Sequence, residues 1–229
     1  MITARNDPSA SLDRSEVVAL AELLDRHFHA VSEAQVARDL ADKTAIIRLF
    51  DGDQLIGFST FAYARIRWQG EEIGAVWSGD TIVDPVAWHA AALPAAWLRA
   101  VRSLHGERGR LAWCLICSGV RTWRFMTSCC LGYAPGPEAT AEMLSLRDHL
   151  ARLRYGDGYH AGIVRLAKPQ PLRPHLLDLP AHLARDPACA AFEALNPGHA
   201  HGDELACAAW LGPATMTRIG RAAWARSTA

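Results

Sequence analysis

Residues 45–118 decide the fold of this 229-residue chain; they contain AIIRLF (45–50), QLIGFSTFAYARIRW (54–68), EEIGAVWSGDTIV (71–83) and LAWCLIC (111–117). The first three segments read as strands, and the short turns Asp51-Gly52-Asp53 and Gln69-Gly70 predict that they form an antiparallel meander. Asp84-Pro85 ends the third strand, and the apolar periodicity of residues 88–104 predicts a crossover helix. A strand that follows such a helix returns parallel to the strand before it. The order predicts an α/β fold, a mixed sheet with Trp77–Thr81 at its centre.

The flanking segments predict helices before and after this sheet. Asp13-Arg14-Ser15-Glu16 has the spacing of a capping box and Ser32-Glu33-Ala34-Gln35 repeats it, which predicts two helices ahead of the meander. Later periodic segments predict helices over 120–131, 142–154 and 188–195, and strands over 158–166 and 204–211. We divide the chain into a flexible arm (1–12), a core domain (13–166), a proline-rich surface excursion (167–203), and a last strand with a C-terminal helix (204–229).

The composition excludes several classes of protein. Half of the residues are apolar, which predicts a substantial core, and the formal net charge of +0 predicts no bulk attraction to nucleic acid or to a membrane surface. No apolar run approaches the ~20 residues that span a bilayer, and the N-terminus lacks a signal-peptide core. The six cysteines lack disulfide spacing; Cys114 and Cys117 are expected on opposite faces of one strand. We therefore expect a cytoplasmic protein with reduced thiols, and the arginine-rich composition is typical of a GC-rich bacterial genome.

This order of elements resembles the GCN5-related N-acetyltransferase (GNAT) superfamily. The likeness rests on four segments: the first hairpin Asp51–Phe58, the strand-to-helix passage Asp80–Pro85, the buried strand Leu111–Cys117, and Leu131-Gly132-Tyr133 after the next helix. It implies a GNAT-like acyl-CoA N-acyltransferase fold whose central strands splay apart around the donor. The implied activity is transfer of an acyl group, acetyl in the superfamily's usual case, from a CoA thioester to an amine by direct attack.

The same resemblance implies where acetyl-CoA or another acyl-CoA would bind. Backbone groups at Ile82 and Val83 would hold the pantetheine arm, and Trp88, His89 and Ala90 would meet the pyrophosphate at the start of the following helix, where unpaired N–H groups favour anions. Residues 86–92 contain none of the glycines that the superfamily usually carries there. Three outcomes stay open: altered CoA binding, a donor carried on an acyl carrier protein as in N-acyl synthases, or no donor at all.

Acyl transfer to an amine needs a base, donors for the oxyanion and an acid for the leaving thiol. Asp80 is the best-placed carboxylate, because burial on a central strand would raise its pKa towards neutrality. Tyr133 is the nearby candidate acid; Tyr63, Tyr155 and Tyr159 have no positional support. The candidate substrate-binding residues lie on the third strand and at the carboxyl end of the fourth, where ligands often bind in α/β sheets: Trp77, Ser78, Thr81, Ser118 and Arg121.

A metal site is a weaker interpretation of the C-terminal region. His199-Ala200-His201 precedes Asp203 and Glu204, but this segment follows the loop signal Asn196-Pro197-Gly198, so we expect no metal. The expected partners are a small-molecule amine and, as the alternative donor, an acyl carrier protein, with no nucleic acid and no membrane. A homodimer stays open, as does a non-catalytic binding protein that kept the cleft.

Overall fold

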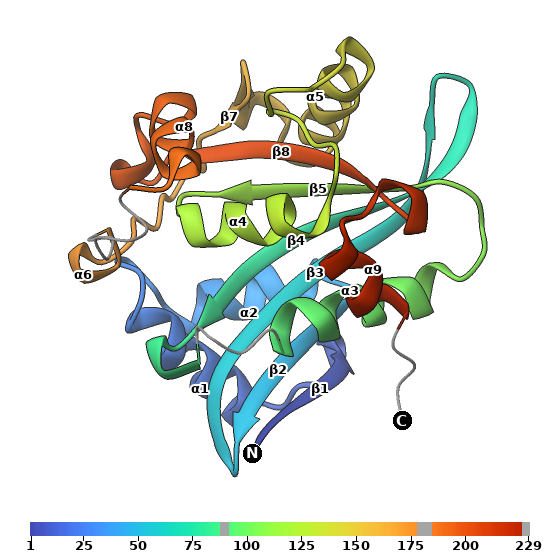
Figure 1. Ribbon diagram of the computed structural model, residues 1–229. Helices are drawn as coiled ribbons and strands as arrows, with labels where there is room; N and C mark the ends of the chain where they lie inside the picture. Colours follow the sequence, from blue (N-terminus) through green and yellow to red (C-terminus); the bar gives the residue numbers. More distant parts are fainter. Residues whose placement is uncertain (88–91, 178–184, 226–229) are drawn as a thin grey trace.

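The computed structural model describes residues 1–87, 92–177 and 185–225, which form one mixed sheet with helices on both faces (Figure 1). The sheet has eight strands in the order β1-β2-β3-β4-β5-β8-β7-β6. Their bounds are β1 Ile2–Pro8, β2 Ala45–Asp51, β3 Gln54–Trp68, β4 Glu71–Val83, β5 Leu111–Cys117, β6 Tyr159–His160, β7 Ile163–Val164 and β8 Glu204–Leu211.

The helices divide between the two faces of this sheet. Their bounds are α1 Arg14–Asp25, α2 Glu33–Ala41, α3 Ala92–His105, α4 Val120–Cys129, α5 Ala141–Tyr155, α6 Pro174–Leu177, α8 Pro187–Leu195 and α9 Arg218–Ala225. Side chains of α3, α4, α8 and α9 share one apolar cluster with β2–β5 and β8. On the opposite face α1 and α2 cover β2–β4, while α5 covers β4, β5 and β8. The expected capping box of α1 is complete, since the Asp13 carboxylate accepts from the Glu16 N–H at 2.9 Å and the Glu16 carboxylate accepts from the Asp13 N–H at 2.9 Å. At α2 the structure has half of the expected box, in which Ser32 Oγ accepts from the Gln35 N–H at 3.3 Å.

The strand order confirms the predicted α/β fold. β2, β3 and β4 form the antiparallel meander, and the chain passes through α3 to β5, which lies parallel to β4. β8 then pairs antiparallel with β5. Cys114 and Cys117 belong to different apolar clusters and so lie on opposite faces of β5, as the alternation predicts.

The two central strands separate half-way along their length. β4 pairs with β5 only from Gly74–Trp77 against Leu111–Cys114, although β4 continues to Val83 and β5 to Cys117. Figure 1 shows the two strands diverging beyond this ladder. The cause lies in β4, where Ser78 pairs with Phe61 but Thr81 pairs with Ser59, so that one residue of β3 opposes two of β4. Such a bulge bends the strand that carries the extra residue.

Aromatic packing fixes the joined part of the two strands. The rings of Trp97 in α3 and Trp113 in β5 lie 4.7 Å apart, and Phe125 of α4 packs edge-on against Trp97 at 5.6 Å. The Trp113 indole N–H donates to Ser78 Oγ at 2.7 Å, just where the ladder ends. A buried indole fills apolar space in the core, and its hydrogen bond to an acceptor also fixes the position of the strand that carries that acceptor.

Two expectations about local structure are wrong. Residues 1–12 are not a flexible arm, because β1 pairs antiparallel with β2 along its whole length. Its polar sequence, ITARNDP, is typical of an edge strand with little side-chain burial, which is why composition alone did not indicate pairing. Residues 158–166 form the short hairpin β6–β7 rather than one strand, because Ala161 and Gly162 both have positive φ and turn the chain.

The proline-rich excursion is also more buried than its composition predicts. Within the described part of it, Leu176 of α6 is only 7 % exposed, and Cys189 and Phe192 of α8 are buried in the main core. Prolines do prevent strands there, but a segment without regular pairing can still bury its few large apolar side chains. Leu172 forms an isolated bridge with Phe28, which joins the excursion to the end of α1.

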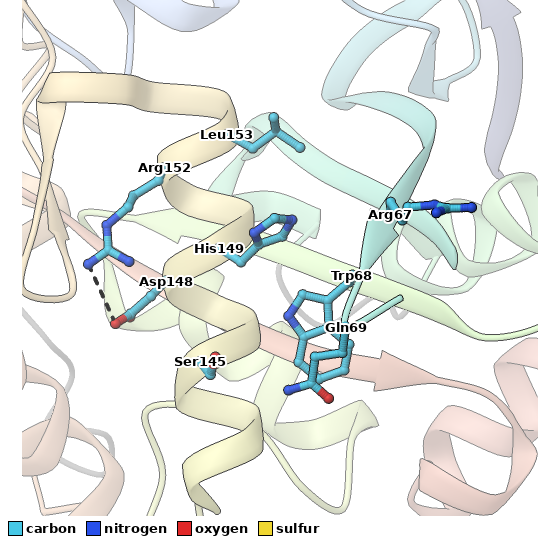
Figure 2. Close-up of a pocket in the computed structure, with 8 residues that line it drawn as sticks. All are labelled: Arg67, Trp68, Gln69, Ser145, Asp148, His149, Arg152 and Leu153. Atoms are coloured by element: carbon cyan, nitrogen blue, oxygen red, sulfur yellow. Dashed lines mark ion pairs between the residues drawn. The ribbon is translucent and has the colours of Figure 1, made fainter. Parts of the chain in front are cut away.

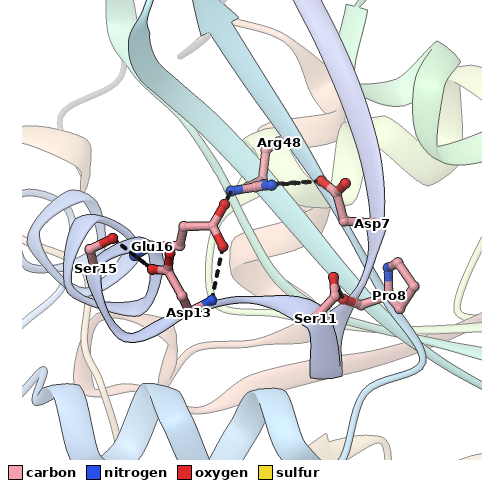
Figure 3. Close-up of polar contacts among 7 residues, drawn as sticks. All are labelled: Asp7, Pro8, Ser11, Asp13, Ser15, Glu16 and Arg48. Atoms are coloured by element: carbon pink, nitrogen blue, oxygen red, sulfur yellow. Dashed lines mark hydrogen bonds and ion pairs between the residues drawn. The ribbon is translucent and has the colours of Figure 1, made fainter.

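One arginine joins the N-terminal strand to the rest of the sheet (Figure 3). Arg48 of β2 pairs with Asp7 of β1 at 2.8 Å and with Glu16 of α1 at 2.6 Å, and its side chain is 10 % exposed. The Arg48 guanidinium and the Asp13 N–H hold the pKa of Glu16 below its usual value. A buried cation with two carboxylate partners is costly to disrupt, because each partner then loses a charged hydrogen bond.

We therefore expect Arg48→Met to lower the free energy of unfolding by about 2 kcal/mol. The matched control is Arg38→Met on the exposed side of α2, which should change it by less than about 0.5 kcal/mol. Urea unfolding at pH 7 and low salt measures both. Equal stabilities of the two variants would show that β1 does not depend on this pair.

Candidate functional site

A cavity of about 780 Å³ lies at the open end of the splay. Its walls come from segments far apart in the sequence: the end of α1, the end of β4, the start of α3, the loop and first turns of α4, and the excursion with α6 and α8. Most of the lining is apolar, including Phe28, Ile82, Leu93, Val120, Leu176 and Phe192. A mainly apolar hollow with a few convergent polar groups is the usual form of a small-molecule site.

The structure brings five of the predicted site residues together in this cavity: Thr81, Ile82, Val83, Ser118 and Arg121. Arg121 also donates to the Leu176 carbonyl at 2.9 Å, so it holds α6 against α4. Thr81 and Ser59 share a hydroxyl hydrogen bond of 2.8 Å across the bulge. Three further predicted residues, Trp88, His89 and Ala90, lie outside the described residues.

Asp80 does not line the cavity, and neither do three other predicted residues. Trp77 packs on the α5 face and donates its indole N–H to the Leu150 carbonyl at 3.0 Å. Ser78 accepts from Trp113 inside the core. Tyr133 packs against Trp123 with ring centroids 6.2 Å apart, and burial raises the pKa of its hydroxyl. These contacts give all three a place in the packing beside the cavity.

Asp80 lies on the bulge of β4, on the face opposite α3 and α4. Burial raises its pKa to about 6, while the nearby Lys43 opposes that shift and Asp39 adds to it. Gly79 permits this arrangement, since a Cβ there would meet the Thr60 hydroxyl and would lie 2.6 Å from Lys43 Cε. Thr60 Oγ1 is buried without a hydrogen-bond partner among the described residues. The carboxylate of Asp80 therefore titrates close to neutral pH, as a general base requires.

Two titratable groups next to Asp80 were missed as site residues. Glu204 is the first residue of β8, and burial together with the charge of Asp80 raises its pKa to about 8. Tyr155 at the end of α5 interacts electrostatically with both carboxylates, and burial raises its pKa well above the usual value. A glutamate that opens an otherwise apolar strand, ELACAAWL, was the available signal; from the sequence we considered Glu204 only as a metal ligand.

Two histidines contribute polar atoms to the cavity wall. His27 at the end of α1 is buried, with Nε2 3.7 Å from the Asp84 carboxylate, and burial lowers its pKa. His199 Nδ1 is buried without a hydrogen-bond partner in the part of the chain that the structure describes. Because burial disfavours the charged imidazolium, His27 is neutral at pH 7 and can donate or accept a hydrogen bond.

A second hollow, of about 810 Å³, lies between the end of β3 and α5 (Figure 2). Its walls are Arg67, Trp68 and Gln69 on one side and polar residues of α5, among them Asp148 and His149, on the other. Figure 2 shows these side chains spread along an open surface. None of the predicted site residues that the structure describes lines it, so we place the candidate site at the splay.

The described residues hold neither a cluster of metal ligands nor a membrane-spanning helix. No group of three or more His, Cys, Asp or Glu side chains in them is arranged to hold a metal ion. None of the described helices has both the length and the apolar character that crossing a membrane would require.

No protein-family model matches the chain, and no curated protein matches its sequence. Among solved structures it is similar to a probable N-acyltransferase from Enterococcus faecalis, with 13% identity over 57% of this chain and 32% of that chain and a TM-score of 0.42. It is also similar to the GNAT family N-acetyltransferase YhbS from Escherichia coli, solved with CoA (19% identity, 55% and 67% coverage, TM-score 0.40). A third is an acyl-CoA N-acyltransferase from Pseudomonas aeruginosa (18% identity, 50% and 79% coverage, TM-score 0.38).

All three are named as acyltransferases, the class that the sequence resembles. The chain spans about a third of the Enterococcus protein, at 32%. At TM-scores of 0.38–0.42 these similarities assign neither an activity nor a substrate to this chain. The strand order, the splay and its cavity are the observations on which the function must be argued.

Asp80 allows a test of the site that needs no substrate. A carboxylate whose pKa is raised in the folded protein favours folding below the unfolded pKa and loses that contribution as pH rises through the folded value of about 6. We therefore expect Asp80→Asn to gain stability relative to the natural protein between pH 4 and pH 7.5, by about 2 kcal/mol.

Chemical unfolding at the two pH values measures this difference. The control is Asp84→Asn, at the end of the same strand, which removes an ion pair of 3.2 Å with Arg26 and should lower stability at pH 7.5. A relative stability of Asp80→Asn that does not change with pH would show that Asp80 is not desolvated.

Proposed function

We propose that this protein is an N-acyltransferase that moves an acyl group from a thioester to an amine by direct attack. The observation that carries the proposal is the splay of β4 and β5, with an apolar cavity on the end of the gap and a near-neutral carboxylate, Asp80, beside it. A thioester donor needs such a gap, because its extended arm must reach the middle of the sheet. The amine then approaches from the face on which Asp80 lies.

Different residues of the site carry out different steps of the proposed reaction. The edge of β4 beyond Trp77, which includes Ile82 and Val83, lies outside the β4–β5 ladder and supports the donor arm. The amine nitrogen bonds to the carbonyl carbon, the carbon–sulfur bond breaks, and one amine proton passes to Asp80, directly or through water. The sulfur leaves as a thiolate and takes up a proton, for which Tyr133 is the candidate acid. Asp80 then returns its proton to solvent, and Tyr133 regains one from solvent, which restores the starting state.

The cavity favours an acyl chain longer than acetyl. Burying each methylene of a chain against apolar walls contributes about 0.8 kcal/mol. The apolar walls of the cavity, which include Phe28 and Phe192, offer such a surface. This lining supports the second candidate, an N-acyl synthase whose donor is held on CoA or on an acyl carrier protein, with a small amine as acceptor.

The donor class is tested by thermal unfolding with free CoA, acyl-CoA thioesters of increasing chain length, and acylated carrier protein. A donor at a hundredfold excess over its dissociation constant should add about 2.7 kcal/mol. We expect the stabilisation to grow from acetyl to medium chains. Stabilisation by carrier protein alone would favour the synthase, and no effect of any thioester would overturn the proposal.

The role of Asp80 is tested by turnover. With a thioester that binds and a panel of primary amines, Asp80→Asn should lower kcat about 10²- to 10⁴-fold while the thermal shift with the donor stays unchanged. Release of free thiol measures the rate. Asp53→Asn, in the exposed β2–β3 turn, is the control and should keep full activity. Unchanged turnover in Asp80→Asn would remove this residue from the mechanism.

A further inference from the structure

Glu204 of β8 and Asp80 of β4 lie on the two strands that flank the end of β5 in the sheet. In the antiparallel ladder Leu205 pairs with Cys117, so Glu204 stands opposite Ser118, the residue that follows β5. Leu205 and Cys207 belong to the cluster on the α3 and α4 face, which places the alternating position Glu204 on the other face, towards α5. There the Ser118 hydroxyl donates a hydrogen bond to its carboxylate.

Asp80 occupies the same face from the opposite side of the gap. The last β4–β5 pair joins Trp77 to Cys114, so Asp80 stands three residues beyond it, on the part of β4 that has separated from β5. Tyr155 at the end of α5 interacts electrostatically with Asp80 and with Glu204. The two carboxyl groups thus flank the mouth of the gap, with Ser118 and Tyr155 beside them.

The other charged groups that face this pair are accounted for among the described residues. Lys43 and Asp39 approach Asp80 from α2 and the residues after it, with opposite effects on its charge. Asp203 approaches Glu204 along the chain, and its charge is balanced by Arg165 at 2.8 Å. On α5, Arg154 pairs with Asp42 rather than with either carboxylate. Neither member of the pair therefore has an arginine of its own.

We propose that Glu204 and Asp80 form one acid–base pair across the splay, in which Glu204 is the positioning residue that retains a proton while Asp80 acts as the base. The inference rests on the acyl transfer proposed above. Lys43 is the nearby cation, but it acts on Asp80 without outweighing burial. Two desolvated carboxyl groups with this much compensation do not both ionise easily, so the pair holds one proton near neutral pH. Ionisation of Glu204 would give the pocket two negative charges, which hold an acceptor amine as its non-nucleophilic ammonium ion.

The pair has a measurable signature in the free protein. Burial places the pKa of Asp80 at about 6 and that of Glu204 at about 8, the second raised partly by the charge of the first. Carbon-13 NMR of the side-chain carboxyls should show two steps, and Asp80→Asn should move the Glu204 midpoint down by about one pH unit. A Glu204 midpoint near the ordinary glutamate value, or one that Asp80→Asn leaves in place, would overturn the pair.

The pH–rate profile tests the role in turnover. We expect kcat to rise through the lower step and to fall through the upper one. Glu204→Gln keeps the shape of the side chain but cannot ionise, so its rate should stay flat above the lower step. Glu107→Gln, which is exposed, should keep both limbs. A falling limb that persists in Glu204→Gln would mean that Glu204 is only structural.

A second variant keeps the proposal testable if Glu204→Gln does not fold. Ser118→Ala removes a hydrogen bond that favours the Glu204 carboxylate, so the upper NMR step and the falling limb should both move to higher pH. An unmoved upper step would contradict the assignment. If no thioester is turned over, the proposed function fails, but the NMR titration still decides whether the pair exists.

Discussion

The register of β3 against β4 is the constraint on which the site depends. Between Ser59 and Phe61 a single residue, Thr60, faces both Gly79 and Asp80. This one extra residue bends β4 away from β5, so the ladder between them ends at Trp77 and the gap opens. It also turns Asp80 to the face of α2 and α5, away from the face on which α3 and α4 pack. The cavity and the near-neutral carboxylate thus have one structural cause.

The bulge is stabilised by contacts on both sides of it. Before it, Ser78 accepts from the Trp113 indole at 2.7 Å, which fixes the last joined residues of the two strands. Beyond it, the Thr81 hydroxyl bonds to Ser59 at 2.8 Å and to the Gly79 carbonyl at 3.2 Å. Two desolvated carboxyl groups work against this stability, since each disfavours the folded state once it ionises. A site that costs stability can persist only where the surrounding packing is strong, as around Trp97 and Trp113.

The sequence predicted the helices and strands better than it predicted which of them lie next to each other in the fold. Alternation and capping patterns reflect local forces, so the meander, the crossover and β8 could be read from short windows. The edge strand β1 could not, because its pairing depends on Arg48 reaching Asp7 across forty-one residues of chain. Glu204 was missed for the same reason: its relation to Asp80 arises only when β8 inserts beside β5. Asp80 could be selected as a candidate from the sequence because its neighbours in sequence already mark a buried strand.

The contacts of the two arginines at the cavity bear on how a donor could be bound there. Arg121 donates to the Leu176 carbonyl, and Arg124 pairs with Asp186 ahead of α8, so both join the excursion to α4. An arginine that is committed to a protein acceptor contributes less to an incoming phosphate, because that acceptor must first be given up. The remaining wall is mostly apolar, and its polar atoms include the neutral His27. Under the proposed function, recognition at this end of the splay would therefore depend on burial of apolar surface, and the length of the acyl chain would matter more than the charge of the donor.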